Sequence, residues 1–420
     1  MSNEPNPTQE DALASLRAEA ASADPAKVYA LATALVARME MEEAFPLFIQ
    51  AAAAGHNRAR IEAARMLLYG VGTDPNPGQG VRLLEEAETA GNVIAAYLLA
   101  LISVGNQVVT RDARINQRLL LAVNAGYAPA LTTAAIHFGR RNDEQDQALC
   151  VGLLRQAASV GDPVAAQLLA ARMPTSAGDD GEASASGAAA AFDSLPACSV
   201  RPFALGLVRE RLALEETWQQ PPVKRLSDRP KLGAIDNLLS ADECRLLMTM
   251  AQPRLSHSHT LDPQSGAKSF NAIRTSQDAS FDPLQEDLAL RLVQARMATA
   301  AGVELVFAEP LIVLRYAPGE QYHPHRDYLP SAALADNRPQ AGDRAGTICA
   351  YLNDVEAGGE TVFPAAGLTI APTAGSAIAF ANLQSDGSPD PDSLHAGLPV
   401  ERGEKWLATL WIRQGPYRDF

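Results

Sequence analysis

The sequence predicts a multidomain chain: an N-terminal all-α solenoid of helical hairpins, followed by an α+β domain built on a sandwich or jelly roll. Three observations support this fold class. The first third repeats with a fixed period, a stretch of small polar residues interrupts it, and short alternating segments fill the last third. A chain of 420 residues has room for two or three domains with separate cores.

The repeat is marked by Gly55, Gly91, Gly126 and Gly161, which recur at intervals of 36, 35 and 35 residues. Alanine stands four residues before and four residues after each glycine, and a large apolar residue stands seven residues before it. Glycine suits the left-handed position that ends a helix, here the second helix of each hairpin. Small alanines let neighbouring helices approach closely, so stacked hairpins bury one continuous core.

The stretches Tyr69-Gly70-Val71-Gly72 and Leu83-Leu84-Glu85-Glu86-Ala87 show which repeat this is. Residues 26–172 resemble the Sel-like branch of the tetratricopeptide-related repeats. The resemblance implies an array that binds a protein partner. The alternative is an array that only stabilises or dimerises the chain. Residues 1–25 are expected to form a polar leader.

The segment 173–228 is expected to be a linker, because Ser, Ala, Gly and Asp dominate its first part and cannot bury much surface. A helix is expected near 205–217, before Pro221-Pro222. Its sequence leaves open whether it belongs to the repeats or to the domain that follows.

The C-terminal domain is expected over 229–420. Ser240-Ala241-Asp242-Glu243 is a capping box that opens a helix, and a second helix is expected over 282–301. Short strands separated by Gly and Pro turns follow. They are expected at 310–316, 346–352, 369–370, 376–380 and 406–413.

Composition limits the partners and cellular locations that fit this chain. The net charge is −14 and the pI is near 5.0, which argues against nucleic acid or an anionic membrane as partner. The N-terminus lacks the basic and apolar regions of a signal peptide, and no apolar run is long enough to span a bilayer. Cys150, Cys198, Cys244 and Cys349 are scattered, which indicates reduced thiols and a cytoplasmic location.

The candidate site lies in the strand-rich region. A strand places residues i and i+2 on one face, so His325 and Asp327 can point to the same place. A distant His395 would complete two imidazoles and one carboxylate, the facial triad typical of non-haem Fe(II) sites. Lys405 follows ten residues later on a predicted strand. This set of residue types favours oxidation chemistry.

Three stretches carry a second resemblance. They are Leu314 to Tyr328, Tyr351 to Pro364, and Ser393 to Trp406. Over about 230–415 the chain resembles the prolyl 4-hydroxylase family of 2-oxoglutarate- and Fe(II)-dependent dioxygenases. The resemblance implies a double-stranded β-helix, the jelly roll of this family. It also implies Fe(II), 2-oxoglutarate and dioxygen as cofactor and co-substrates, with ascorbate as a further expected requirement.

The resemblance assigns roles position by position. His325, Asp327 and His395 would bind iron, and Lys405 would pair with the distal carboxylate of 2-oxoglutarate. Tyr316 and Thr361 would donate hydrogen bonds to that carboxylate. Two further residues are candidates for contact with the substrate: Arg274, with a surface charge as the alternative, and Trp411. Trp411 has the same strand parity as Lys405, and its alternative is core packing. His323 is expected at the surface or behind the metal ligands, and His257 and His259 in solvent.

The expected function is hydroxylation of a prolyl residue in a peptide or protein that the repeats recruit. One alternative is a hydroxylase of another residue, a free amino acid or a small metabolite. A second alternative is a non-catalytic adaptor. Degeneration usually removes a metal ligand or the lysine, and all four are present, which favours the enzyme.

Overall fold

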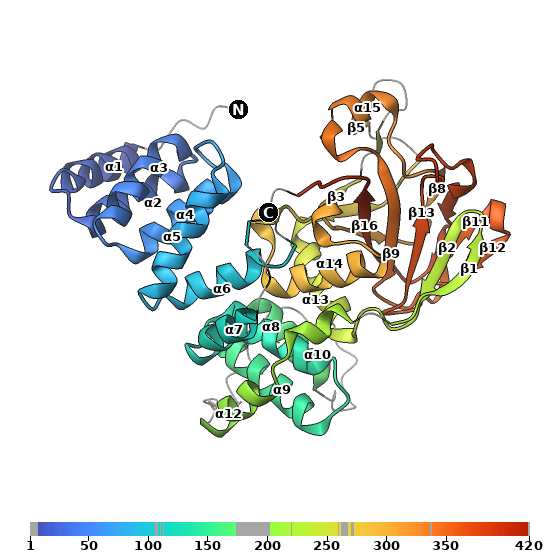
Figure 1. Cartoon of the computed structure of the whole chain (residues 1–420), viewed down its shortest axis with the longest axis horizontal. Coiled ribbons are helices and arrows are strands. Elements are labelled where there is room, and N and C mark those ends of the chain that lie inside the picture. The colour runs from blue at the N-terminus through green and yellow to red at the C-terminus, as the bar shows by residue number, and fades with distance from the viewer. Residues whose placement is uncertain are drawn as a thin grey trace. The chain divides into compact units, whose positions relative to one another are not determined.

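The computed structural model describes residues 7–105, 108–109, 111, 113–173, 202–219, 221–258, 260–261, 268–269, 273–336 and 338–418 (Figure 1). The chain divides into two compact units. The first comprises residues 1–103 and 107–122, and the second comprises residues 104–106 and 123–419. The second unit contains the last repeat helices together with all the strands, which cover 224–413.

The first unit is helical. Its helices are α1 (Pro7–Ala20), α2 (Pro25–Ala37), α3 (Met41–Ala53), α4 (Asn57–Tyr69), α5 (Pro77–Thr89), α6 (Val93–Ile102) and α7 (Arg114–Asn124). Most of the expected polar leader is thus helix α1. It forms because Leu13, Leu16 and Ala20 pack against the core that α2 and α3 share.

The four repeat glycines adopt the backbone conformation that the period predicts. Gly55, Gly91, Gly126 and Gly161 have φ angles of 91°, 83°, 73° and 92°. They follow α3, α5, α7 and α9 (Glu144–Ser159), the second helix of each hairpin. The left-handed region is costly for residues with a Cβ, which explains the regular glycine. The predicted helical repeat is confirmed.

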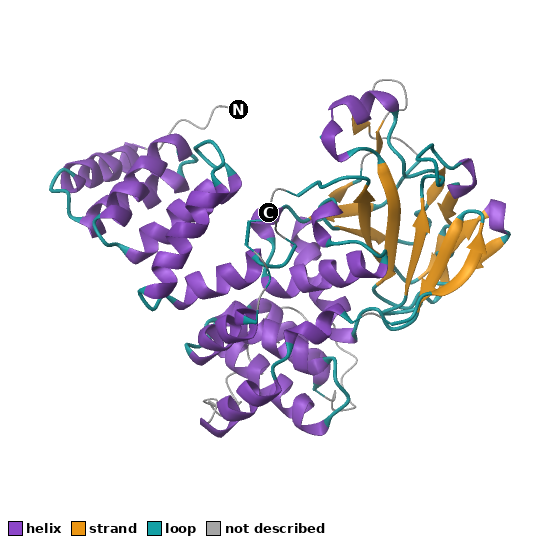
Figure 2. Cartoon of the chain, in the orientation of Figure 1, coloured by secondary structure: helices purple, strands orange, loops and turns teal. Residues whose placement is uncertain are grey.

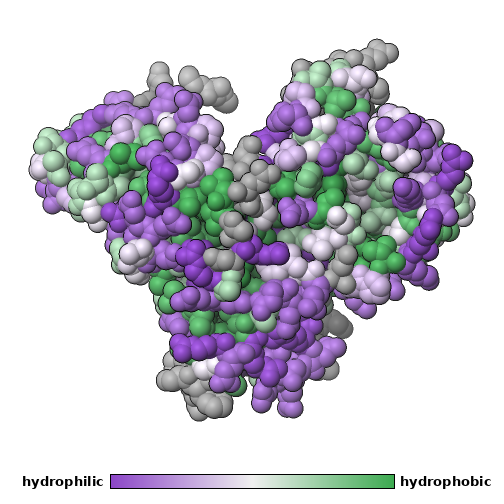
Figure 3. All heavy atoms as spheres, viewed as in Figure 1, coloured by the Kyte–Doolittle hydropathy of each residue, from purple (hydrophilic) through white to green (hydrophobic). Residues whose placement is uncertain are grey.

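The second unit begins with the rest of the array, α8 (Ala128–Gly139), α9 and α10 (Pro163–Arg172), followed by α12 (Pro202–Arg211). Hydrophilic residues dominate the visible surface around α9 and α10 (Figure 3). The helix expected over 205–217 is α12 followed by a 3₁₀ turn, Leu214–Trp218. Arg211 of α12 pairs with Asp146 of α9, and Arg296 Nε donates to the carbonyl of Thr217 at 2.8 Å. This segment therefore bonds to both the repeat and the domain that follows.

Two antiparallel sheets form the jelly roll (Figure 2). The larger has the order β1-β2-β13-β9-β16-β7-β6-β3, and the smaller has the order β12-β11-β14-β8. The larger sheet consists of β1 (Lys224–Asp228), β2 (Lys231–Ile235), β13 (Ala377–Ala381), β9 (Arg344–Tyr351), β16 (Lys405–Arg413), β7 (Ile312–Tyr316), β6 (Gln277–Ser280) and β3 (Ser256–His257). The smaller sheet consists of β12 (Leu368–Ile370), β11 (Thr361–Phe363), β14 (His395–Gly397) and β8 (Tyr322–His325).

Strand β1 starts at Lys224, inside the segment expected to be linker, because it pairs with β2 as the edge of the larger sheet. The remaining strands are the pairs β10 (Ala357–Gly358) with β15 (Val400–Arg402) and β4 (Thr260–Leu261) with β5 (Lys268–Ser269). A short helix, α15 (Ser331–Asp336), precedes β9. Tyr351, Phe363, Phe380 and Leu407 belong to one apolar core to which both sheets contribute.

Two helices pack against the larger sheet, α13 (Ala241–Ala251) and α14 (Leu288–Ala300). The predicted capping box is present, since Glu243 N–H donates to Ser240 Oγ and Ser240 N–H donates to Glu243. Helix α14 is shorter than the expected 282–301. It begins after Asp287, whose carboxylate accepts from the Leu290 N–H and so caps the first turn.

Buried ion pairs fix α13 to the repeat helices within the second unit. Glu243 pairs with Arg140 of the α8–α9 turn and with Arg296 of α14, and Asp242 pairs with Arg172 of α10. Burial opposes ionisation of Glu243, but Arg296 and Arg140 hold the pKa of its carboxyl below the usual range. Among the helices that the structure describes, none is long and apolar enough to cross a bilayer.

The conformational role of Gly161, which follows α9, can be tested by comparison with Gly152, which lies inside that helix. Gly161→Ala should lower the free energy of unfolding by about 1 kcal/mol, because alanine must adopt the left-handed φ of 92°. Gly152→Ala should raise it by about 0.5–1 kcal/mol, because Gly152 lies inside α9. An added Cβ meets nothing within 4 Å at either position, so only the backbone differs. Urea denaturation followed by tryptophan fluorescence measures both, since Trp218, Trp406 and Trp411 all lie in the second unit. Equal effects of the two substitutions would refute the explanation.

Candidate metal centre

Strand pairing brings the three predicted ligands together. His325 ends β8 and stands directly opposite His395, the first residue of β14. Asp327 follows two residues after His325. Its Oδ1 lies 3.6 Å from His325 Nε2 and its Oδ2 lies 3.9 Å from His395 Nε2. One ligand atom from each residue lies within 4.8 Å of the others, so a single ion could contact all three.

Both imidazoles are oriented by backbone carbonyls. His325 Nδ1 lies 2.8 Å from the carbonyl of His323, and His395 Nδ1 lies 3.0 Å from the carbonyl of Ser393. A carbonyl only accepts, so Nδ1 must carry the proton and Nε2 presents its lone pair to the site. Burial, together with His395, lowers the pKa of His325 to about 3, so this ring is neutral. The donor set of two imidazoles and one carboxylate fits Fe(II).

The carboxylate is held by two residues that sequence reasoning missed. Thr347 Oγ1 donates to Asp327 Oδ2 at 2.7 Å, and Asn382 Nδ2 donates to Thr347 Oγ1 at 2.9 Å. Burial opposes ionisation of Asp327, but His395, His325 and Arg344 hold the pKa of its carboxyl below the usual range. Asp327 is therefore an anion whose orientation is fixed before any ligand arrives.

Aromatic rings surround the imidazoles. Tyr322 stacks on His325 with a centroid separation of 3.4 Å and an interplanar angle of 14°. Phe363 stacks against His395 at 5.4 Å, and the Phe380 ring meets the same histidine at 4.7 Å. These contacts limit rotation of both ligands and keep water away from their outer faces.

Lys405 lies deep in the cavity beside the three ligands. It is the first residue of β16, pairs with Tyr316 of β7, and is 2% exposed. Its Nζ lies 5.6 Å from the ring centroids of Tyr316 and Tyr351. Within the described part of the chain no carboxylate forms a salt bridge with it, and burial lowers the pKa of Lys405 to about 8. A buried ammonium without a counter-ion is ready to receive an anion.

Tyr316 and Thr361 line the same cavity as Lys405. Burial raises the pKa of Tyr316, so its hydroxyl keeps the proton that it would donate. Tyr351 Oη donates to Thr361 Oγ1 at 2.9 Å, which leaves the threonine hydroxyl proton to point elsewhere. Tyr351 was not among the predicted site residues. Its position can be found from strand alternation, since Thr347, Cys349 and Tyr351 of β9 all reach the cavity side.

Arg274 and Trp411, the candidates for substrate contact, both line the cavity. Arg274 is buried and fixed, because its Nη2 donates to Asp278 Oδ2 and its Nε donates to Ser276 Oγ, both at 3.1 Å. The guanidinium of Arg344 lies 3.5 Å from the centroid of the Trp411 ring. Arg344 was not singled out from the sequence.

The other histidines lie apart from the site, as far as they are described. The His323 side chain is exposed, and its backbone carbonyl orients His325. His257 is exposed on β3. His259, expected in solvent, lies outside the described residues, as does Cys198.

Comparisons with known proteins agree with this site. Residues 311–413 match the model of the 2OG-Fe(II) oxygenase superfamily. A probable prolyl 4-hydroxylase 3 of Arabidopsis thaliana is 34% identical over 212 residues, which cover 46% of this chain and 72% of that protein.

Two solved structures are similar to part of the chain. A viral collagen prolyl hydroxylase from Paramecium Bursaria Chlorella virus-1 has 28% identity and a TM-score of 0.33, covering 43% of this chain and 95% of that one. A protective antigen with an SLR fold from uropathogenic Escherichia coli has 22% identity and a TM-score of 0.33, covering 37% of this chain and 34% of that one.

The fold and the site define a 2-oxoglutarate- and Fe(II)-dependent oxygenase domain, which follows an N-terminal array of helical hairpins. Within that superfamily, the chain belongs to the prolyl 4-hydroxylase family.

The hydroxyl group of Thr347 gives a graded test of metal binding. Thr347→Val should weaken binding of Co²⁺, used as a stable substitute for iron, by about 10–100-fold, because Asp327 loses its orienting donor. Thr347→Ser should restore most of the affinity. Asp327→Ala should weaken it at least as much as the valine variant, whereas Asp228→Ala on the exposed edge strand should not change it. Calorimetric titration measures all four. Unchanged affinity in Asp327→Ala would exclude this metal centre.

The pKa of Lys405 predicts how stability changes with pH. The fall from 10.5 to about 8 corresponds to about 3 kcal/mol at pH 7, where the buried amine is charged. Lys405→Met removes this penalty, so it should raise the free energy of unfolding by about that amount at pH 7. As the pH rises, the Lys405 amine loses its proton near pH 8 in the folded protein but only near pH 10.5 in the unfolded chain. Between these two values the wild type regains stability, so the advantage of the variant should shrink. Denaturation at pH 7 and at pH 10 measures the difference. Lys231→Met at an exposed site is the control, and an advantage independent of pH would contradict the assignment.

Proposed function

We propose that this chain uses Fe(II), 2-oxoglutarate and dioxygen to hydroxylate a prolyl residue in a peptide or protein, which the helical repeats help to recruit. The observation that carries the proposal is one cavity with two features that together suit a metal-chelating dicarboxylate. A facial triad that fits Fe(II) lines it, and so does Lys405, whose ammonium has no salt bridge with any described carboxylate. A dicarboxylate with a keto group can satisfy both.

His325, Asp327 and His395 would hold the metal, and Lys405 would pair with the distal carboxylate of 2-oxoglutarate. Tyr316 and Thr361 would donate to the same carboxylate. With iron bound, the centre supplies the activation of dioxygen. In the balanced reaction, 2-oxoglutarate, dioxygen and a substrate C–H bond give succinate, carbon dioxide and a C–OH bond. The apolar and aromatic walls keep water from the site, which protects the reaction from side products.

The cavity opening suits a peptide. Ile273 and Leu398 are apolar residues directly beside the lining residues Arg274 and Gly397, and they are 45% and 37% exposed. Apolar side chains exposed beside a buried polar site offer contact surface to a substrate larger than the cavity. Arg274 and Trp411 would contact that substrate. The identification of relatives as prolyl 4-hydroxylases supports a prolyl residue as the target.

Recruitment by the repeats rests on the array itself, since solenoids present extended surfaces to protein partners. A requirement for ascorbate and the cytoplasmic location stay predictions from the sequence.

Turnover tests the proposed function directly. The full chain with Fe²⁺, 2-oxoglutarate and a pool of proline-containing peptides should form succinate and add about 16 Da to proline on admission of air, a mass gain set by one oxygen atom. Asp327→Ala should lower succinate formation at least about 100-fold, because the metal loses its carboxylate. Lys405→Met should raise the KM for 2-oxoglutarate more than it lowers kcat.

The Asp228→Ala protein serves as the matched control, since it loses an exposed aspartate far from the metal ligands in sequence. If succinate forms but the mass gain lies on another residue type, the chain hydroxylates that residue type instead of proline. If the metal-loaded protein forms no succinate with any peptide, the result would favour the alternative that the chain is a non-catalytic adaptor.

A further inference from the structure

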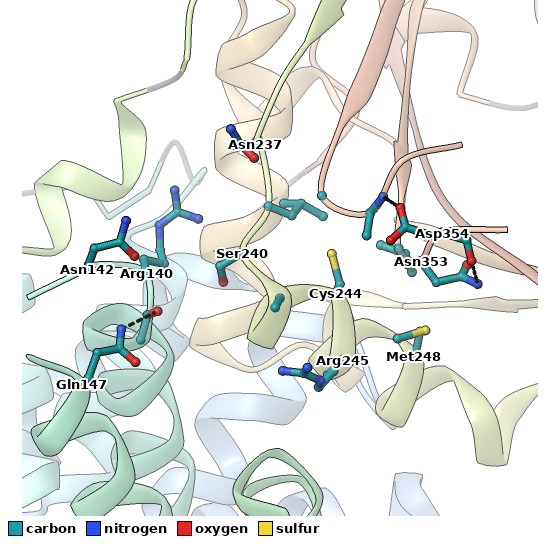
Figure 4. Close-up of a pocket in the computed structure, with 16 residues that line it drawn as sticks. Arg140, Asn142, Gln147, Asn237, Ser240, Cys244, Arg245, Met248, Asn353 and Asp354 are labelled. Atoms are coloured by element: carbon teal, nitrogen blue, oxygen red, sulfur yellow. Dashed lines mark hydrogen bonds between the residues drawn. The ribbon is translucent and has the colours of Figure 1, made fainter. Parts of the chain in front are cut away.

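A second cavity, of about 750 Å³, lies within the second unit and away from the metal ligands (Figure 4). One side is the turn between α8 and α9, the floor is α13 with the residues before it, and the other side is formed by two turns that follow β9 and precede β13. Figure 4 shows Arg140, Asn142 and Gln147 on one side of α13, and Asn353 and Asp354 on the other. We call this cavity the junction cleft.

The ion pairs at the start of α13, which borders the junction cleft, have a surplus of positive charge. Four guanidinium groups share the two carboxylates at the start of α13. Arg140 and Arg296 pair with Glu243, whereas Arg172 and Arg245 pair with Asp242. The difference of four cations and two anions is two positive charges, in a chain whose net charge is −14. The amino-terminal end of α13 adds a partial positive charge.

Two of these cations face the cleft and keep open surface. Arg140 and Arg245 both belong to the lining, and their side chains are 21% and 39% exposed. Each shares its carboxylate with a second arginine, so neither is fully neutralised. Asp354, the carboxylate on the opposite side, accepts from the Ala374 N–H at 2.9 Å and offsets one of the two surplus charges.

Amide side chains complete the lining. Asn142 and Asn237 are exposed, and they offer both donors and acceptors to a backbone. A cavity of this volume holds a few residues of an extended chain, and its guanidinium groups suit carboxylate side chains. The shape and the charge together favour an acidic peptide over a neutral small molecule.

We propose that the junction cleft binds an acidic peptide segment of a protein partner. The last repeat hairpin supplies one wall, so the site is part of the second unit and needs no movement of the first. Binding itself is independent of the proposed hydroxylation, whereas its use in presenting a substrate rests on that function.

One lining residue connects the junction cleft to the end of the strand that carries Lys405. Asn353 Oδ1 accepts from the Trp406 N–H, and Asn353 Nδ2 donates to the Glu404 carbonyl, both at 2.8 Å. These two residues flank Lys405. A peptide in the cleft would therefore touch the residue that fixes the strand end on which Lys405 lies.

Fluorescence anisotropy of a fluorescein-labelled hexaglutamate peptide tests the proposal on the full chain without metal or 2-oxoglutarate. Binding should be saturable, should weaken with added salt, and should be absent for labelled hexalysine. The double variant Arg245→Gln, Asn142→Asp makes the cleft more negative by two charges without touching the buried arginines. It should bind at least tenfold more weakly.

The double variant Arg225→Gln, Arg229→Gln is the matched control. It also lowers the net charge by two, but at exposed side chains on and beside the edge strand β1. Equal weakening in both double variants would overturn the proposal in favour of general electrostatic attraction. Failure of hexaglutamate to bind the wild type would overturn it as well. Because the measurement contains no turnover, a protein inactive in the succinate assay can still pass it.

Discussion

The pairing of β8 with β14 is the constraint on which the metal centre depends. In this register His325 and His395 stand directly opposite each other, so the smaller sheet itself sets the separation of the two imidazoles. The same backbone supplies the carbonyls that fix both Nδ1 protons. A slip of one residue would turn one imidazole to the other face of the sheet. Ligand geometry is thus a property of the sheet more than of flexible side chains.

Charge is buried in two different ways in the second unit. Glu243, Glu286 and Glu309 are buried together with arginines. In each ion pair, the attraction between the opposite charges offsets part of the free-energy cost of removing them from water. Lys405 forms no salt bridge with any described carboxylate, and Asp327 faces the two imidazoles of the site. The first arrangement holds helices and strands together. The second leaves charge available to groups that enter from solvent, which is a mark of a functional site.

The features that could be predicted from the sequence are those that follow a regular spacing, either the repeat period or the alternation of a strand. The glycine period located the hairpins because a left-handed helix end tolerates few other residues, and strand parity placed Lys405 and Trp411 on one face. Contacts that join distant segments were not predictable. Thr347 and Asn382 meet Asp327 only through the sheet order, and Tyr351 reaches Thr361 only across the two sheets. The start of the larger sheet at β1 and the packing of α1 against α2 and α3 also depend on partners elsewhere in the chain.

Helix α14 is buried on nearly all sides, and it contacts the strand β16 as well as the repeat helix α8. A helix that packs against a sheet ordinarily exposes its polar face to solvent. Here that face carries Arg296, fully enclosed and bonded to α13 and to the segment before β1. For the last repeat hairpin, the division between repeats and oxygenase that is visible along the sequence is therefore not a division in space. Exchanging the last hairpin between relatives would require exchanging the matching face of the oxygenase with it.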